Sequence, residues 1–398
     1  MTGTAVSAAA GWTGAHPPQA HPADVAGPGV GGASPPCTST VVVIGTGLIG
    51  ASIGQALTAR GHAVHLRDAQ LSHARVAATL GAGSTESPVP AAVGLVVVAV
   101  PPRVIAEVVE GALQDYPGAT VTDVGSVKAG VLDALWDRGA ELGRYVGSHP
   151  MAGSQHSGPV TARADLFDGR TWVITPHRRS APDSVGHVQQ LAADCGARAV
   201  VMDVDDHDAA VARVSHLPHL MSVLMAGHLT TVPERHLLLA GQGLRDVTRI
   251  AGGDPTLWEQ IVGANSAAVL AELRTVAGEL AQVITALETG PGTVGLRAQL
   301  ERAVAGTRKI PGKHGAPPVD YRQVVVAIPD APGALARLFA DVGEAGVNVE
   351  DIAIEHDQAR QVGYLAISVT PAQADPLVRA MTARGWDVSP EQPGPLRS

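Results

Sequence analysis

The sequence predicts an α/β chain made of a doubly wound parallel sheet, an all-helical segment and a small second α/β unit. Between residues 38 and 203, short runs of branched apolar residues alternate with helical segments, a pattern typical of a parallel sheet buried on both faces. From 204 to 305 helical periodicity takes over. Residues 321–392 alternate again between strands and helices. We therefore expect several separate cores, since 398 residues are too many for one.

Composition and charge exclude several classes of protein. A net charge of −9 with no run of Lys and Arg does not fit a nucleic-acid partner. Cys37 and Cys195 lie far apart, so neither a disulfide framework nor a metal site is predicted. Residues 1–37 are rich in Ala, Gly and Pro and lack the features of a secretory signal, which predicts a disordered tail. Because no apolar run approaches the roughly 20 residues that span a bilayer, we expect a cytoplasmic protein with no membrane partner.

The first ordered element is a strand followed by a glycine-rich turn. VVVI at 41–44 predicts a buried strand, and GTGLIG supplies Gly45, Gly47 and Gly50 before a helix that ends near Gly61. Gly45 permits the tight turn, Gly47 lets the backbone approach a pyrophosphate, and Gly50 allows close helix packing, while the helix N-terminus holds the phosphates. This context predicts a Rossmann dinucleotide-binding domain over 38–203. The residues expected to bind the cofactor here are Gly45, Thr46, Gly47, Leu48, Ile49, Gly50 and Asp68.

Asp68 bears on the choice of cofactor. It ends the next predicted strand, AVHLR, 18 residues after Gly50. A carboxylate at that point accepts hydrogen bonds from ribose hydroxyls and repels a 2′-phosphate, which favours NAD. The adjacent Arg67 could serve a 2′-phosphate, so NADP remains the alternative.

The alternation then continues to the end of this domain. The elements expected are a helix near 71–80, a strand at 95–100, a helix at 102–113, a strand at 120–124, a helix at 127–142, a strand at 171–176, a helix at 183–196 and a strand at 197–204 that extends the sheet. Ligands gather at the carboxyl ends of parallel strands. That rule selects VPPR, where Val100 and Pro101 are expected to bind the cofactor, together with DVGSVK at 123–128 and SHPMAGS at 148–154. The alternative is that these residues only form turns, which the prolines at 101 and 102 favour.

The last two segments carry candidate site residues. Ser126 stands where a serine N-cap is expected, whereas Lys128 in the first helical turn opposes the helix dipole and is explained by an anionic ligand. A purely structural role for both residues remains open. His149 is restricted to extended geometry by Pro150, and the small polar residues around it predict a surface beside the nicotinamide.

Two stretches of the helical segment, 204–305, carry polar groups where a bundle should be apolar. In SHLPH, His216 and His219 lie three residues apart on one helix face, but no third ligand stands at a metalloprotease spacing. RDVTRIAGGDPTLW contains Asp246, Arg249 and Trp258. An arginine three residues after an aspartate forms a structural pair more often than a substrate clamp, and both interpretations stay open.

Residues 306–320 predict a basic, proline-rich linker to the last unit. Over 321–392 the predicted order is β-α-β-β-α-β, which is the ferredoxin-like arrangement.

Five motifs together resemble one family. GTGLIGAS, DVGSVK, SHPMAGS, SHLPH and RDVTRIAGGDPTLW occur in the order found in prephenate and arogenate dehydrogenases, which the chain resembles from about residue 40 to 300. The resemblance implies NAD-dependent oxidative decarboxylation of a cyclohexadienol. A base removes the ring hydroxyl proton, C4 gives hydride to the nicotinamide, and the ring carboxylate leaves as carbon dioxide.

The resemblance also implies residue roles. His149 resembles the catalytic histidine and Ser126 the serine that orients it, while Arg249 resembles the arginine that grips a substrate carboxylate. It further implies a homodimer formed by the helical domain, with Trp258 near the partner's site. The residues expected to bind substrate are His216, His219, Arg249, Ser154, Gln155, Trp258, Asp246 and Lys128.

Substrate choice between prephenate and arogenate depends on one group. Arogenate carries an ammonium where prephenate has a keto group, so a nearby carboxylate would favour arogenate. Gln155 is a neutral amide where family members can carry an acidic residue, which favours prephenate. The alternative is that Gln155 faces solvent and selects nothing.

The segment IPDAPGALARLFADVGEAGVNVEDI resembles the ACT domain, a module that often binds an amino acid. This implies feedback regulation by an aromatic amino acid. The ligand site it implies consists of Asp330, Pro332, Gly333, Ala334 and Asn348. The alternative is that Pro332 and Gly333 only make a turn and the unit only dimerises.

Three other functions are alternatives. An arogenate dehydrogenase would give tyrosine directly. A sensor of NAD and amino acids would need no base, and the joint presence of His149, Ser126 and Arg249 argues against it. A different β-hydroxyacid-type dehydrogenase would carry a lysine-bearing helical motif, which the sequence lacks.

Overall fold

The structure of the chain is a computed structural model, which describes residues 39–153, 158–290, 294–310, 321–329, 331–357 and 362–389. The tail predicted at 1–37 lies outside the described residues, as do Ser154, Gln155, Asp330 and most of the predicted linker.

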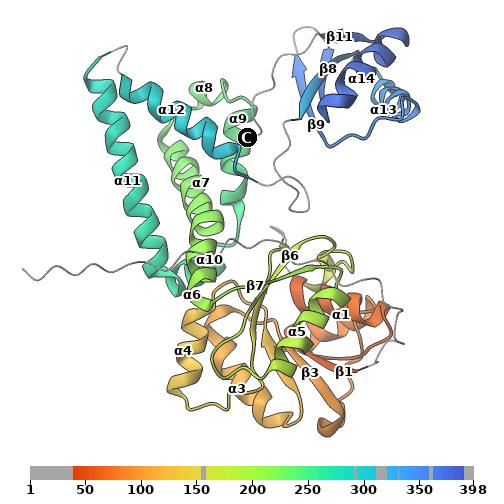
Figure 1. Cartoon of the computed structure of the whole chain (residues 1–398), viewed down its shortest axis with the longest axis vertical. Helices are drawn as coiled ribbons and strands as arrows, with labels where there is room; N and C mark the ends of the chain where they lie inside the picture. Colours follow the sequence, from red (N-terminus) through yellow and green to blue (C-terminus); the bar gives the residue numbers. More distant parts are fainter. Residues whose placement is uncertain are drawn as a thin grey trace, which may run out of the picture. The chain divides into compact units, whose positions relative to one another are not determined.

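A parallel sheet of four strands forms the centre of the first domain (Figure 1). Its strand order is β2-β1-β3-β4. Its strands are β1 (Thr40–Ile44), β2 (Ala63–Arg67), β3 (Val93–Val98) and β4 (Thr120–Asp123). One face packs against helices α1 (Leu48–Ala59), α2 (Leu71–Thr79) and α5 (Pro182–Asp194). The other packs against α3 (Ile105–Asp115) and α4 (Ala129–Asp137). The strands are buried on both faces, which confirms the predicted doubly wound sheet.

The last strand of this domain does not extend that sheet, contrary to the prediction. A second sheet has the order β5-β6-β7 and consists of β5 (Gly147–Pro150), β6 (Thr171–Thr175) and β7 (Arg198–Val201). β5 runs antiparallel to β6, whereas β7 runs parallel to it. The edge of β4 that faces away from β3 is occupied, because Val121 exchanges backbone hydrogen bonds with Arg144 and Val146. β7 therefore cannot pair with β4 there, and it pairs with β6 instead.

The helical segment predicted at 204–305 is confirmed as all-helical. Its α-helices are α6 (Val204–Val211), α7 (Leu217–His228), α8 (Glu234–Leu237), α9 (Gln242–Arg249), α10 (Pro255–Ala264), α11 (Ser266–Glu288) and α12 (Val294–Thr307). A π-helical turn over Ala212–His216 joins α6 to α7. Short 3-10 turns occupy Pro90–Ala92, Pro102–Val104, Pro159–Thr161, Leu229–Thr231 and Ile250–Gly252.

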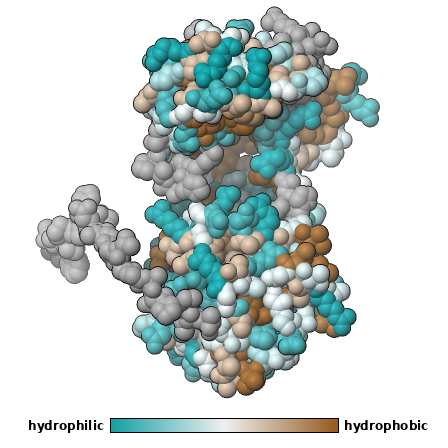
Figure 2. Space-filling model, turned by 90° about the vertical axis from the view of Figure 1, so that its right-hand side faces the viewer, coloured by the Kyte–Doolittle hydropathy of each residue, from teal (hydrophilic) through white to brown (hydrophobic). Residues whose placement is uncertain are grey.

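Large apolar side chains remain exposed on several of these helices. Those on α7 and α11 are Val223, Leu224 and Met225 on α7 and Leu270, Leu280, Ile284 and Leu287 on α11. Within the described ranges, no helix is both long and apolar enough to cross a membrane. On the face shown in Figure 2, hydrophobic residues likewise lie in groups between hydrophilic ones.

The C-terminal unit is an antiparallel sheet with two helices and its own core. Its elements are β8 (Arg322–Pro329), α13 (Ala334–Glu344), β9 (Asp351–Asp357), β10 (Val362–Val369), α14 (Pro371–Ala383) and β11 (Asp387–Ser389). The sheet order β11-β8-β10-β9 and this element order confirm the predicted ferredoxin-like arrangement.

Candidate active site

The glycine-rich turn has the geometry that a dinucleotide requires. Gly45 has φ +93°, a backbone conformation that favours glycine, and a Cβ there would overlap the carbonyl oxygen of Ala99. A Cβ on Gly50 would overlap the carbonyl oxygen of Gly45. Gly47 is the N-cap of α1, and no described protein atom lies within 4 Å of where its Cβ would be. The turn therefore leaves the N-terminus of α1 open to a phosphate.

Asp68 follows β2 and is bonded to this turn. Its Oδ2 accepts hydrogen bonds from the Thr46 backbone N–H (2.7 Å) and hydroxyl (2.8 Å), and its Oδ1 accepts one from the Gln70 N–H (2.8 Å). The neighbouring Arg67 lies over the ring of Tyr116, with its Nη1 3.9 Å from Asp115. Arg67 is thus already held by an acidic and an aromatic partner, which favours NAD over NADP.

The other residues expected to bind the cofactor lie around the same turn. Leu48 and Ile49 open α1, and Val100 follows β3 with its Cγ1 3.0 Å from where a Cβ of Gly45 would be. Pro101, the next residue, is exposed. These residues, the turn and Asp68 fit a dinucleotide.

Ser126 does not cap a helix, and that prediction is wrong. Helix α4 begins at Ala129, its N-cap is Lys128, and Ser126 lies half-buried in the preceding loop. The capping acceptor comes from α6 instead. The carboxylate of Asp208 accepts hydrogen bonds from the backbone N–H groups of Lys128 (2.9 Å) and Ala129 (2.9 Å).

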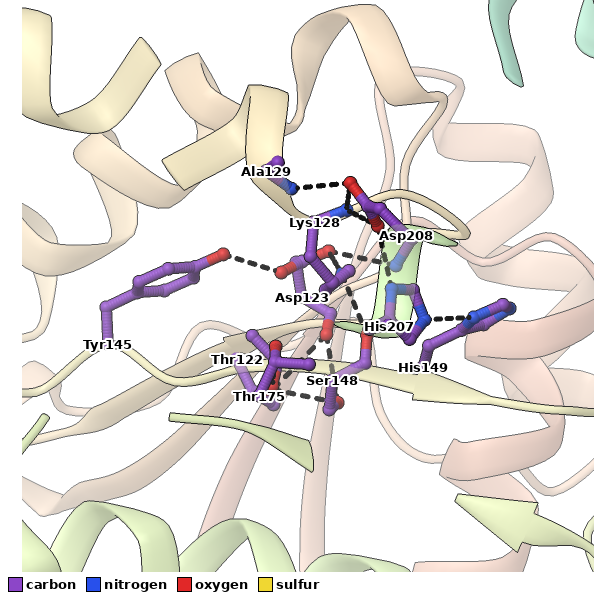
Figure 3. A network of polar contacts seen from close by, with 12 residues as sticks. Thr122, Asp123, Lys128, Ala129, Tyr145, Ser148, His149, Thr175, His207 and Asp208 are labelled. Atoms are coloured by element: carbon purple, nitrogen blue, oxygen red, sulfur yellow. Dashed lines mark hydrogen bonds and ion pairs between the residues drawn. The ribbon is translucent and has the colours of Figure 1, made fainter. Parts of the chain in front are cut away.

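Lys128, which is predicted to bind substrate, is paired within the chain. Its side chain is only 2% exposed and forms an ion pair with Asp123 (Figure 3). Its Nζ also donates to the Ser148 carbonyl oxygen (2.8 Å), and Asp123 accepts from the Tyr145 hydroxyl (2.7 Å). The carboxylate of Asp123 is therefore an anion of the chain itself that pairs with the Lys128 ammonium.

His149 lies on β5 and is the first member of a chain of polar contacts (Figure 3). Its Nδ1 is 3.0 Å from Nε2 of His207, and Nδ1 of His207 is 2.7 Å from Oδ1 of Asp208. Burial, together with the nearby His207, Lys128 and His216, holds the pKa of His149 well below 6.5. His149 is therefore neutral at physiological pH, as a general base requires.

His216 ends the π-helical turn and is buried. Its Nδ1 is 3.2 Å from Nδ2 of Asn265, whose amide also donates to the carbonyl oxygen of Asp208 (2.8 Å). Burial lowers the pKa of His216 to about 4. π-Helical turns occur frequently at functional sites, which agrees with the prediction that His216 lies in the pocket.

His219 and Trp258 form a stacked pair within the chain. Their rings are 3.5 Å apart between centroids with an interplanar angle of 7°, and the ring of His216 meets Trp258 edge-on at 6.3 Å. Gly253 lies against them, because a Cβ there would be 2.6 Å from Nε1 of Trp258. Trp258 thus adjoins histidines of its own chain, and its place near the partner's site stays a prediction.

The remaining predicted residues lie on exposed segments. Arg249 ends α9, where it is exposed, and Asp246 on the same helix accepts a hydrogen bond from Gln242 Nε2 (2.8 Å). In the C-terminal unit, Gly333 has φ +85° and caps α13, which starts at Ala334. Pro332 and Asn348 are exposed, and Asn348 Nδ2 donates to Glu350 (2.6 Å).

The sequence did not single out His207, Asp208 or Asn265. The first two stand in VDDHDAAV, which is typical of the acidic first turn of a helix, and Asn265 joins α10 to α11. His207 and Asp208 lie 58 and 80 residues from the His149 and Lys128 that they contact. No local pattern could have identified them.

Family models match most of the described chain. A model for the nucleotide-binding domain of prephenate dehydrogenase matches residues 53–201, and a model for its dimerization domain matches residues 203–301.

Individual relatives agree with this match. The chain is 36% identical over 345 residues to the probable prephenate dehydrogenase NovF of Streptomyces niveus, which covers 84% of this chain and 95% of the relative. It is 29% identical over 253 residues to the prephenate dehydrogenase of Bacillus subtilis, covering 62% of this chain and 67% of that protein.

Two solved structures share the fold. Prephenate dehydrogenase from Aquifex aeolicus, in complex with hydroxyphenyl propionate and NAD+, has a TM-score of 0.60 and 26% identity over 67% of this chain and 96% of its own. Arogenate dehydrogenase from Synechocystis has the same TM-score and identity, over 68% of this chain and 99% of its own.

Proposed function

The chain belongs to the prephenate dehydrogenase family, and we propose on that premise that it converts prephenate to 4-hydroxyphenylpyruvate by NAD-dependent oxidative decarboxylation in tyrosine biosynthesis. The observation that carries this proposal is His149, a neutral imidazole on β5 whose Nδ1 is bonded to His207. The glycine-rich turn and Asp68 fit the dinucleotide that the reaction needs.

The reaction requires one base that can return its proton. When bound, NAD supplies the hydride acceptor. His149 takes the ring hydroxyl proton as hydride leaves C4, so that the oxygen becomes a carbonyl. Cleavage of the bond to the ring carboxylate releases carbon dioxide and returns an electron pair to the ring. The phenolate oxygen then recovers the proton from His149, and no net proton is released.

Reduction of NAD by the purified full chain tests this function directly. Prephenate should support NAD reduction with release of carbon dioxide, and a simple 3-hydroxy acid should not. Activity with the 3-hydroxy acid alone would favour another dehydrogenase class, and NAD binding without turnover of either substrate would favour a sensor.

Substrate preference rests on Gln155, which lies outside the described residues. A neutral amide favours the keto group of prephenate, whereas a carboxylate would attract the ammonium of arogenate. The comparison of kcat/KM for the two substrates, in the natural chain and in Gln155→Glu, decides between them. A natural chain that prefers arogenate contradicts the assignment.

Arg249 is proposed to bind a carboxylate of the substrate. We expect Arg249→Ala to raise KM for prephenate by about 10- to 100-fold, because a charge-assisted hydrogen bond is lost, with little change in KM for NAD. Arg245→Ala is the matched control, since Arg245 is exposed on the same helix. Equal effects of Arg249→Ala on both KM values would instead indicate a structural role.

The chain contains the family's dimerization domain. The exposed apolar residues of α7 and α11 are the surface that we propose to be buried in a homodimer.

The C-terminal unit is proposed to be an ACT domain through which tyrosine inhibits the enzyme. Residue 310 lies between the end of α12 and the start of β8. Deletion of the chain after this residue is expected to leave the dehydrogenase activity and to abolish its inhibition by tyrosine. Calorimetry with tyrosine on the full chain and the truncated chain checks this. Inhibition that survives the deletion would place tyrosine in the active site, and absence of binding to the full chain would end the proposal.

A further inference from the structure

We propose that His207, Asp208 and Asn265 form a positioning network that fixes the tautomers of the two site histidines, His149 as a hydrogen-bond acceptor at Nε2 and His216 as a donor at Nε2. The catalytic consequence of this network rests on the proposed function. The assignment of the tautomers rests on the hydrogen bonds around α6 and on the ionised carboxylate of Asp208.

The carboxylate of Asp208 accepts hydrogen bonds from His207 and from the backbone of Lys128 and Ala129. Burial acts to raise its pKa, but hydrogen bonds from His207 and from the backbone of Ala129 and Lys128 hold the pKa below its usual value. The ionised carboxylate can only accept hydrogen bonds. His207, which is fully buried with Nδ1 2.7 Å from Asp208, must therefore carry a proton on Nδ1.

His207 links Asp208 to His149. A histidine that carries a single ring proton, on Nδ1, has a lone pair on Nε2, and Nε2 of His207 is 3.0 Å from Nδ1 of His149. His149 must then donate from Nδ1, so that its Nε2 is unprotonated. This is the nitrogen that can take the substrate proton, because Nδ1 is already bonded (Figure 3).

Asn265 links the backbone of Asp208 to His216. Asn265 Nδ2 is 2.8 Å from the carbonyl oxygen of Asp208, and this oxygen can only accept, which fixes the orientation of the amide. The same Nδ2 is 3.2 Å from Nδ1 of His216, so this ring nitrogen accepts. A neutral His216 therefore carries its proton on Nε2. The substrate has one hydroxyl, which the acceptor Nε2 of His149 can deprotonate. It also has two carboxylates, one of which the donor Nε2 of His216 can bind.

Asp208 also accepts hydrogen bonds from the backbone at the start of α4. Its carboxylate caps α4 at Lys128 and Ala129, directly after the loop that carries Ser126. One short segment of α6 thus holds the base through His207, the Ser126 loop through Asp208, and His216 through Asn265. We assign these three residues to positioning, because each acts through another residue.

Two substitutions of His207 separate positioning from folding. His207→Gln keeps an acceptor oxygen near the place of Nε2, whereas His207→Leu fills similar space without one. We expect His207→Leu to lower kcat with prephenate by about 10²-fold with KM for NAD unchanged, and His207→Gln to stay within about fivefold of the natural chain. Similar losses in both variants, or a His207→Leu enzyme with near-natural kcat, would overturn the positioning role.

Asp208→Asn tests the tautomer itself. With its amide oxygen at the place of Oδ2, the side chain can still accept from the Ala129 N–H, but the amide nitrogen at the place of Oδ1 would face Nδ1 of His207 and shift the His207 proton to Nε2. His149 would then hold its proton on Nε2 and lose its basic site. We expect kcat to fall by about 10²- to 10³-fold, as neutral replacement of a carboxylate behind a catalytic histidine does elsewhere. Asp206→Asn is the control, because Asp206 is exposed on the same helix.

A spectroscopic measurement on the natural full chain does not depend on any variant folding. Histidine ¹⁵N chemical shifts distinguish the two tautomers, and His149→Asn and His216→Asn identify the two signals. We expect His149 protonated at Nδ1 and His216 protonated at Nε2. The opposite tautomer at His149 overturns the inference even if prephenate is turned over. Inactivity with prephenate, combined with the expected tautomers, would refute only the proposed function.

Discussion

Replacement of His149 by asparagine is expected to lower kcat with prephenate by about 10²- to 10⁴-fold, the usual contribution of a positioned general base. The protein should still fold and bind NAD, because the Gly45–Gly50 turn and Asp68 do not contact His149. Steady-state kinetics and NAD titration of the same preparation check both parts. His236→Asn, at an exposed position of α8, is the matched control.

The pH dependence gives a second readout of the same residue. Burial first, and then the nearby His207, Lys128 and His216, hold the pKa of His149 well below 6.5. The base of the free enzyme therefore stays unprotonated as the pH falls from about 8 to about 6.5, and becomes protonated only at lower pH. We expect kcat/KM for prephenate to be flat across that interval. An ordinary histidine midpoint near 6.5 that disappears in His149→Asn would contradict this environment.

Replacement of Lys128 by methionine is expected to have the largest effect on stability. The substitution leaves the fully buried carboxylate of Asp123 without its cation. Breaking one side of a buried ion pair costs about 3–5 kcal/mol. It also removes the hydrogen bond to the Ser148 carbonyl oxygen, one residue before the base. Urea unfolding of the full chain can be measured by the loss of NAD binding. The midpoint of this transition should lie at a lower urea concentration in Lys128→Met than in the natural chain.

An exposed ion pair provides the comparison for Lys128→Met. Arg138 pairs with Glu110 at 3.0 Å on the surface, where such pairs contribute about 0–1 kcal/mol. Arg138→Met removes the same charge and introduces the same residue, so its midpoint should barely move. Equal shifts in the two variants would show that Lys128 contributes no more than a surface charge, against the assignment of its ammonium to Asp123.

The sequence by itself determined the features that depend on local pattern. Branched apolar runs at 41–44 and 95–98 required strands buried on both faces, and Gly45 and Gly50 were required by a turn that leaves no room for a side chain. The ferredoxin-like order of the last unit followed from the same alternation. These features are encoded within a few residues, so periodicity and glycine placement reveal them.

Only the tertiary structure decided how the polar groups are paired. Ser126 is of a residue type that often caps helices, yet Asp208, 80 residues from Lys128, caps α4. The position of Lys128 predicted a bound anionic ligand, yet its ion-pair partner is Asp123 of the same chain. A buried charge or imidazole takes whichever acceptor the packing brings within about 3 Å. That acceptor can come from any part of the chain, so the protonation of His149 is set by contacts that leave no local pattern in the sequence.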